Sequence, residues 1–230
     1  MALPVHGSTQ RSGNAGTTSL DITSVAVTGT DPTLVVKVAY KDNAGGEIIS
    51  VVWDAVVENQ ALTQIGTEER NGNANSSLWS LAVPVAKTAT VTISLTNSVR
   101  IVGAASVYTG VDQTNPFRTV AVAQANGNSA SPTVDVVALN DEMVVDSLAQ
   151  VSAGPDSALG DHTERHDFIA IGGGDDTKGA SQEKASTGAT ETMGWTMGGS
   201  DNWAVVAAPL QEPQAAPATS PYYFRKMGQG

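Results

Sequence analysis

The sequence predicts an all-β protein, a single antiparallel β-sandwich of the jelly-roll kind. Short runs rich in Val, Thr, Ala and Ile recur along the chain, and many alternate apolar and polar residues with the period of two expected of half-buried strands. Gly, Asn, Asp and Pro separate the runs, as expected of tight turns. Helices are not expected, because no long window combines a 3.6-residue period with a helix-favouring composition.

Three runs show the alternation most clearly. In residues 88–95, Ala, Val, Ile and Leu alternate with Thr and Ser, which predicts one apolar face and one hydroxyl-lined face. Residues 34–40 repeat the pattern with Lys37 on the second face, and residues 190–197 repeat it with Met193 and Trp195 on the apolar face. Further strands are predicted at residues 20–27, 48–53, 61–65, 77–83, 101–108, 134–137, 143–149, 163–171 and 203–210. About a dozen strands at this spacing indicate one sandwich.

The two ends of the chain differ from the middle in composition. Residues 1–18 are predicted to form an extended polar N-terminal arm, and residues 19–211 the sandwich domain. Residues 212–230 are predicted to form a C-terminal tail with a Pro-containing linker. The tail ends in an aromatic and basic cluster that we expect to bind a partner: Tyr222, Tyr223, Phe224, Arg225, Lys226 and Met227.

Composition excludes several classes of function. The 230 residues include no Cys, which removes disulfides, Cys-ligated zinc, iron–sulfur clusters and thiol nucleophiles. With 23 acidic and 12 basic residues, the formal net charge is -11, so nucleic acid and anionic membranes are unfavourable partners. Neither a signal peptide nor a membrane-spanning segment is recognisable, so synthesis in a cytoplasm without export is expected.

Between about residues 20 and 211 an ordered set of short motifs stands out. They are SVVWD (50–54), ALTQIG (61–66), SLWSL (77–81), AASVYTGVDQTNP (104–116), MVVD (143–146), TMGW (192–195) and NWAVVAA (202–208). In their order and spacing they resemble a β-sandwich module of bacteriophage structural proteins and of bacterial surface or secreted proteins. The resemblance implies the fold, and it brings no catalytic residue that can be placed on this chain.

Two segments offer candidate metal ligands. His162, Glu164 and His166 occupy positions i, i+2 and i+4, so on a regular strand they would share one face and could hold a transition metal. The alternative is an ordinary solvent face. In the Gly-rich segment 172–179, Asp175 and Asp176 could ligate Ca²⁺. That segment lacks the spacing of a phosphate-binding loop, and its alternative is a flexible exposed loop.

Among the four Trp residues, Trp79 is the candidate for an exposed sugar-stacking platform, since its neighbours include Ser77 and Ser80. Trp53, Trp195 and Trp203 lie within strand patterns and fit a core. No Gly-x-Ser-x-Gly elbow or recognisable triad is present, so we expect no enzyme and no required cofactor.

Taken with the resemblance, these features favour a structural virion protein of a bacteriophage: a capsid decoration, head-fibre or tail-associated subunit. Its expected partners are copies of itself and other virion proteins, reached by packing of the sandwich and by exchange of the terminal arms. The alternative is a glycan-binding module in a phage attachment device or on a bacterial surface.

Overall fold

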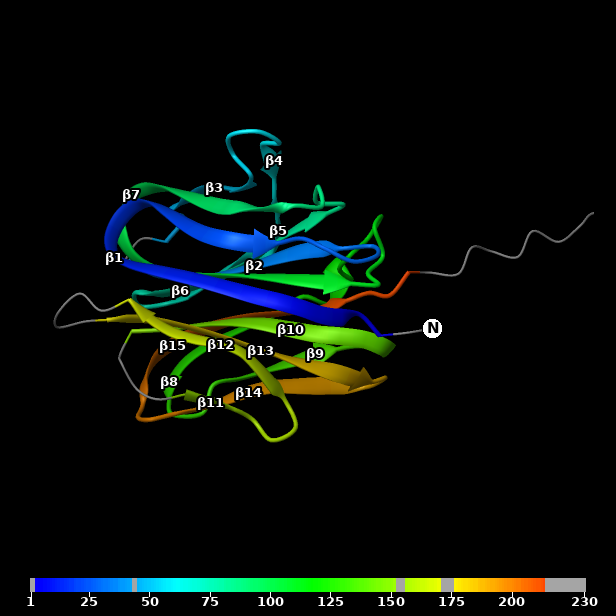
Figure 1. The fold of residues 1–230 in the computed structure, drawn as a ribbon. Helices are drawn as coiled ribbons and strands as arrows, with labels where there is room; N and C mark the ends of the chain where they lie inside the picture. Colours follow the sequence, from blue (N-terminus) through cyan, green and yellow to red (C-terminus); the bar gives the residue numbers. More distant parts are fainter. Residues whose placement is uncertain (1–2, 43–44, 152–155, 171–175, 214–230) are drawn as a thin grey trace, which may run out of the picture.

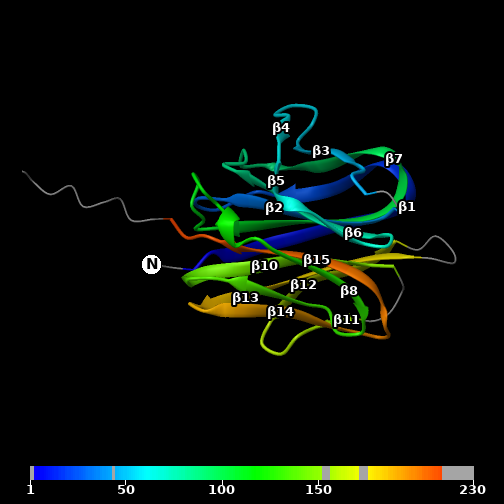
Figure 2. The same cartoon turned by 180° about the vertical axis from the view of Figure 1, so that it is seen from behind.

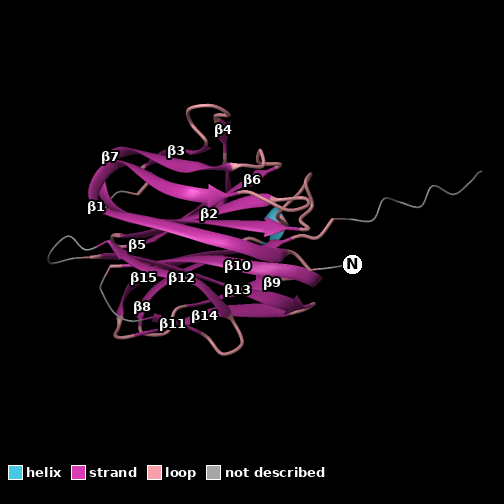
Figure 3. Ribbon diagram, viewed as in Figure 1, coloured by secondary structure: helices cyan, strands magenta, loops and turns pink. Residues whose placement is uncertain are grey.

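The computed structural model describes residues 3–42, 45–151, 156–170 and 176–213 (Figure 1). Within these residues the chain is built of β-strands with one 3₁₀ turn, η1 (Thr119–Ala121) (Figure 3). The first seven strands are β1 (Val5–Ala26), β2 (Thr33–Lys41), β3 (Ile48–Trp53), β4 (Gln60–Ala61), β5 (Thr63–Asn71), β6 (Ala74–Ala82) and β7 (Thr88–Thr109). The others are β8 (Ala123–Ser129), β9 (Thr133–Val137), β10 (Asn140–Gln150), β11 (Asp156–Ala158), β12 (Thr163–Ala170), β13 (Thr177–Thr187), β14 (Thr190–Met197) and β15 (Asp201–Leu210).

The strands form three antiparallel sheets stacked on one another (Figure 1). The first is seven-stranded, in the order β4-β3-β7-β2-β6-β5, with β1 also paired to β7. The second has five strands in the order β12-β13-β10-β15-β8, and the third has three in the order β11-β14-β9. The five-stranded sheet lies in the middle, so its two faces are covered by the other two sheets.

The long strand β7 organises the seven-stranded sheet. Its first part pairs with β3 and its second part with β2, while β1 runs antiparallel beside both parts. The register of β1 on β7 is interrupted around residues 14–19, where irregular pairing lets the two strands bend together. The sheet therefore curls over itself and encloses its own core, which includes Leu34, Val36, Tyr40, Trp53 and Ile93.

A second core lies between the five-stranded and three-stranded sheets, around Met193, Trp195 and Trp203. Two smaller apolar clusters join the curled sheet to the five-stranded sheet. One includes Val35, Leu78 and Phe117, and the other includes Ala39 and Val102. Polar side chains separate these two clusters, and they are described below.

The predicted all-β antiparallel sandwich class is confirmed. The residues assigned to one sandwich build two stacked layers: the curled seven-stranded sheet, and the five-stranded sheet together with the three-stranded sheet. The stacking explains β2, of which only the face opposite Lys37 was expected to be buried. All its residues from Thr33 to Tyr40 are buried, because the five-stranded sheet covers the second face.

The N-terminal segment is extended, as an arm would be, but residues 5–18 belong to β1 and pair within the chain with β7. Their polar side chains remain exposed or half-buried, since β1 lies at the margin of the sheet. Of the Gly-rich segment 172–179, residues 176–179 are described, and the last three of them are not an exposed loop. Thr177, Lys178 and Gly179 begin β13 and are buried; Gly179 lies against Ala39 and Val102 of the curled sheet.

Candidate functional site

The three predicted transition-metal ligands do not converge. His162 precedes β12, and its Nδ1 is hydrogen-bonded to Gln182 Oε1 at 3.0 Å. His166 is buried, with its Nδ1 2.6 Å from Ser181 Oγ, whereas Glu164 is exposed. A register shift between Glu164 and His166 breaks the regular alternation that the prediction required. Within the described part of the chain, no three His, Asp or Glu side chains gather as a metal site.

The other predicted site residues divide into two groups. Asp175 and the tail residues Tyr222, Tyr223, Phe224, Arg225, Lys226 and Met227 lie outside the described residues. Asp176 is half-buried and has interaction partners. Trp79, predicted to be an exposed platform, is half-buried against the core of the curled sheet, and its indole N–H donates to Ser77 Oγ at 3.0 Å. The Trp79 ring therefore packs against the core of the curled sheet.

The connector, residues 110–122, leads from β7 to β8 and so joins the two layers. Its first seven residues end the AASVYTGVDQTNP motif, but no site was predicted there from the sequence. Asp112 stabilises a turn in the connector, because its Oδ1 accepts hydrogen bonds from the backbone N–H groups of Thr114 and Asn115, each at 2.8 Å. The connector also clasps the end of β15: Asp112 N donates to Gln211 O, and Gln211 N donates to Pro116 O, each at 2.9 Å. The tail therefore begins beside the connector.

Arg118 fixes the connector to the strand β10. Its guanidinium donates to both carboxylate oxygens of Glu142, at 3.0 and 2.7 Å, and also to Val137 O at 2.7 Å. Glu142 in turn accepts a hydrogen bond from Leu139 N. Since a bidentate Arg–carboxylate pair fixes orientation as well as distance, the β9–β10 turn is held against the connector.

The connector, the start of β1 and the end of β15 all lie at one end of the molecule (Figures 1 and 2). Val5 pairs with Thr109 at the end of β7, and Val83 N donates to Gln113 Oε1 in the connector. Five large apolar side chains at this end are 55–91 % exposed: Val5, Val83, Val120, Val137 and Leu139. We call this surface the apolar end. Grouped exposed apolar side chains mark an interaction surface more often than isolated ones do.

A groove of about 300 Å³ opens at the apolar end, between the connector and the β5–β6 strands. Ile65, Leu81, Pro116 and Phe117 supply its apolar lining, and hydroxyl-bearing residues such as Thr63 supply its polar lining. β5 is the edge strand of the curled sheet, and among the described strands it pairs only with β6. The connector groove therefore combines an apolar floor with an adjacent sheet edge.

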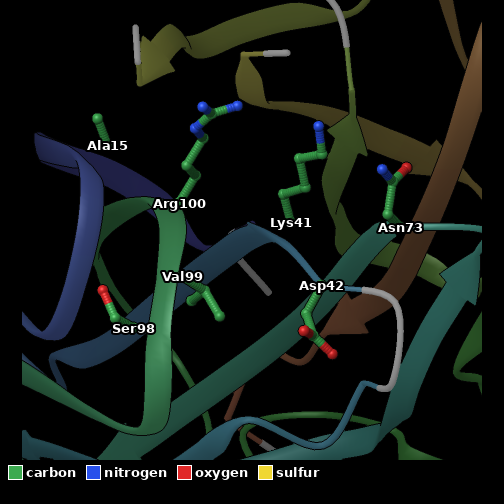
Figure 4. Close-up of a pocket in the computed structure, with 7 residues that line it drawn as sticks. All are labelled: Ala15, Lys41, Asp42, Asn73, Ser98, Val99 and Arg100. Carbon is green, nitrogen blue, oxygen red and sulfur yellow. The ribbon is translucent and has the colours of Figure 1, made fainter. Parts of the chain in front are cut away.

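At the opposite end lies a polar pocket of about 290 Å³, lined in part by Lys41, Asn73, Ser98 and Arg100. Figure 4 shows Lys41, Asn73 and Arg100 reaching in one direction and Asp42 reaching away from them. Lys41, Asp42 and Arg100 have interaction partners of their own. We therefore assign no ligand to this pocket.

Between the two layers runs a buried polar seam centred on Lys37. Lys37 Nζ donates to Ser106 Oγ at 2.5 Å and lies 5.3 Å from the centre of the Tyr108 ring. Tyr108 donates to Glu183, which is paired with Arg165. Burial lowers the pKa of Lys37 to about 7, although the nearby carboxylates of Glu183 and Asp146 act in the opposite direction.

The Lys37–Ser106 contact has the composition of a Ser nucleophile with a Lys base. Both residues are almost fully buried, and neither lines any of the described pockets. Ser106 Oγ is also hydrogen-bonded to Thr9 Oγ1 at 2.8 Å, and Thr9 to His6. Lys37 and Ser106 are buried between the sheets and hydrogen-bonded to each other, so the seam joins the layers and fixes how they are stacked.

Comparisons of the sequence with protein families and with curated proteins, and of the fold with solved structures, found no match. The described part of the chain contains no helix with the length and hydrophobicity needed to cross a bilayer.

Proposed function

We propose that the protein is a structural subunit of a bacteriophage particle: a capsid decoration, head-fibre or tail-associated protein that assembles through its apolar end. The observation that carries this function is the exposure of Val5, Val83, Val120, Val137 and Leu139, which lie in the connector or beside residues that contact it. The resemblance of the ordered sequence motifs to phage structural modules supports the same function.

The physical argument concerns the cost of leaving these side chains in water. Burial of apolar surface contributes about 25 cal/mol per Å², so a second copy that covers several Val and Leu side chains gains stability without rearranging either fold. The connector is already held by Arg118 and Glu142, so little backbone order has to be gained on association. Partners are therefore copies of this chain and other proteins of the same particle.

Self-association is tested by light scattering over a concentration series, with the full chain and the variant Val120→Asp. Val120 is 91 % exposed, so a charge there is expected to break the assembly without unfolding the chain. Val56→Asp is the matched control, because Val56 is 92 % exposed in the β3–β4 loop and is not one of the five side chains of the apolar end. A full chain that stays monomeric at high concentration contradicts this mode of assembly, as does dissociation by Val56→Asp alone.

Membership of a particle is tested separately, by mass spectrometry of phage particles purified from the strain that carries the gene. The chain is expected at a copy number typical of a repeated subunit. Its absence from particles that contain their other structural proteins overturns the assignment.

The glycan-binding alternative is not proposed, because Trp79 is half-buried and its indole N–H is already hydrogen-bonded to Ser77.

A further inference from the structure

We infer that the aromatic and basic tail, Tyr222–Met227, docks in the connector groove of a second copy of the chain, so that two copies exchange tails through their apolar ends. The exchange rests on the proposed function, since it requires the apolar ends to meet. It adds to that function a named ligand and a named binding site.

The first argument is the position of the tail root, which we define as Gln211, the residue directly before the tail. Gln211 is bound to Pro116 in the connector, and Pro116 lines the groove, so the tail starts beside the site that we assign to it. Residues 214–221 can extend over roughly 25 Å at about 3.3 Å per residue. When two copies meet through the same surface, each tail root lies near the groove of its partner, as in a self-complementary two-fold interface.

The chemistry of the two surfaces gives the second argument. The groove has an apolar floor that includes Ile65 and Phe117, with hydroxyl-bearing residues around it. Tyr222 and Tyr223 offer flat apolar rings with one hydroxyl each, and Phe224 adds a third ring. Rings that bury their faces and keep a polar atom at one edge suit a surface of this composition.

Charge gives the third argument. The tail from residue 214 onwards contains two of the twelve basic residues, Arg225 and Lys226, and none of the 23 acidic residues. The rest of the chain is therefore strongly acidic, and attracts this segment before contact is made.

The edge of β5 gives the fourth argument. Thr63 and Ile65 line the groove and belong to this edge strand, whose described pairing partner is β6 alone. An extended peptide can add main-chain hydrogen bonds to such an edge while its side chains enter the neighbouring groove. The tail is expected to bind in this extended form.

The test uses two variants of the full chain. The tail variant carries Tyr222→Ser, Tyr223→Ser and Phe224→Ser. The groove variant carries Thr63→Arg, which places a bulky positive side chain at an exposed position in the groove. Each is expected to weaken self-association by at least about tenfold in light scattering, because aromatic anchors dominate interface energies. Thr23→Arg, at an exposed position in β1, is the control and is expected to associate normally.

Mixing the two variants distinguishes exchange from docking of each tail in its own groove. The tail variant keeps an intact groove, and the groove variant keeps an intact tail, so one tail–groove contact can form between them. A mixture that associates more tightly than either variant alone supports exchange. A mixture that behaves as the sum of its components contradicts it.

The experiments distinguish failure of tail docking from failure of assembly through the apolar end. If the tail variant associates like the unmodified chain while Val120→Asp does not, tail docking is overturned and assembly through the apolar end stands. If the unmodified chain is monomeric, both are overturned.

Discussion

Lys37 Nζ lies 2.5 Å from Ser106 Oγ, between two sheets that bury both side chains. A lysine in such a position costs free energy, because the folded state removes its ammonium group from water. The seam also gives the stacked layers a fixed register, since the hydrogen bonds of Ser106, Tyr108 and Glu183 form in one arrangement.

Replacing Lys37 by Met is expected to raise the free energy of unfolding by about 1–4 kcal/mol at neutral pH. The gain depends on pH, because the pKa of Lys37 is about 7 in the folded protein and near 10.5 when unfolded. Between these values the unfolded state binds more protons, so the unmodified protein gains stability as pH rises. The gain from Lys37→Met is therefore largest below pH 7 and shrinks towards pH 10.

Urea unfolding at several pH values between 6 and 10 measures this difference. Lys87→Met is the control, because Lys87 is about one-third exposed and paired with Asp54, so no stabilisation is expected. A Lys37→Met variant that is less stable than the unmodified protein across the whole range contradicts the prediction.

Gly179 tests how closely the two layers pack. A Cβ at this position would lie 2.9 Å from Val102 Cγ1 and 3.0 Å from Ala39 Cβ, both across the interface between the sheets. Gly179→Ala is therefore expected to lower the free energy of unfolding by about 1–3 kcal/mol, through overpacking. Gly199→Ala is the control, because nothing lies within 4 Å of a Cβ there. Equal thermal midpoints for the two variants would contradict the prediction, because they would show that the sheets accommodate the added methyl group without loss of stability.

Asp146 tests the second core. Its carboxylate accepts hydrogen bonds from Gln182 N, Gln182 Nε2 and Trp195 Nε1, at 2.8–2.9 Å. Asp146→Ala leaves these buried donors without their acceptor, so a loss of about 1–3 kcal/mol or more is expected in chemical unfolding. Asp135→Ala removes an exposed carboxylate bonded to Thr192 and is expected to change stability by about 0.5 kcal/mol or less. A similar loss in both variants would contradict a special role for Asp146.

Alternation along the sequence predicted the strands well where one face meets solvent. In residues 88–95, Val91, Ile93 and Leu95 are buried and the intervening Thr92 and Ser94 are half-buried, as the pattern indicated. The same reasoning predicted the burial of only one of the two faces of β2. Lys37 in an alternating strand indicates a face exposed to solvent. Whether another sheet covers that face depends on residues more than a hundred positions away, such as Glu183.

β13 was missed for a related reason. Its buried part, Thr177–Glu183, is rich in Gly, Ser and charged residues, which carry little strand propensity. Its pairing partners β10 and β12 and the close approach of Val102 to Gly179 determine its structure. The metal prediction failed locally instead, because one register shift between Glu164 and His166 is enough to redirect a side chain. The exposed valines of the apolar end were not predicted, since valine in a β-rich sequence indicates burial.

The pairing of β1 with β7 has a consequence for synthesis of the chain. Val5 pairs with Thr109, so at roughly 5–20 residues per second the first strand leaves the ribosome several seconds before its ladder partner exists. During that interval its backbone N–H and C=O groups face water, and an apolar strand in this state would recruit other nascent chains. Residues 7–18 are instead composed of Gly, Ser, Thr, Asn and similar residues, which water solvates well. Because this segment is polar, we expect it to stay hydrated until its edge can be paired.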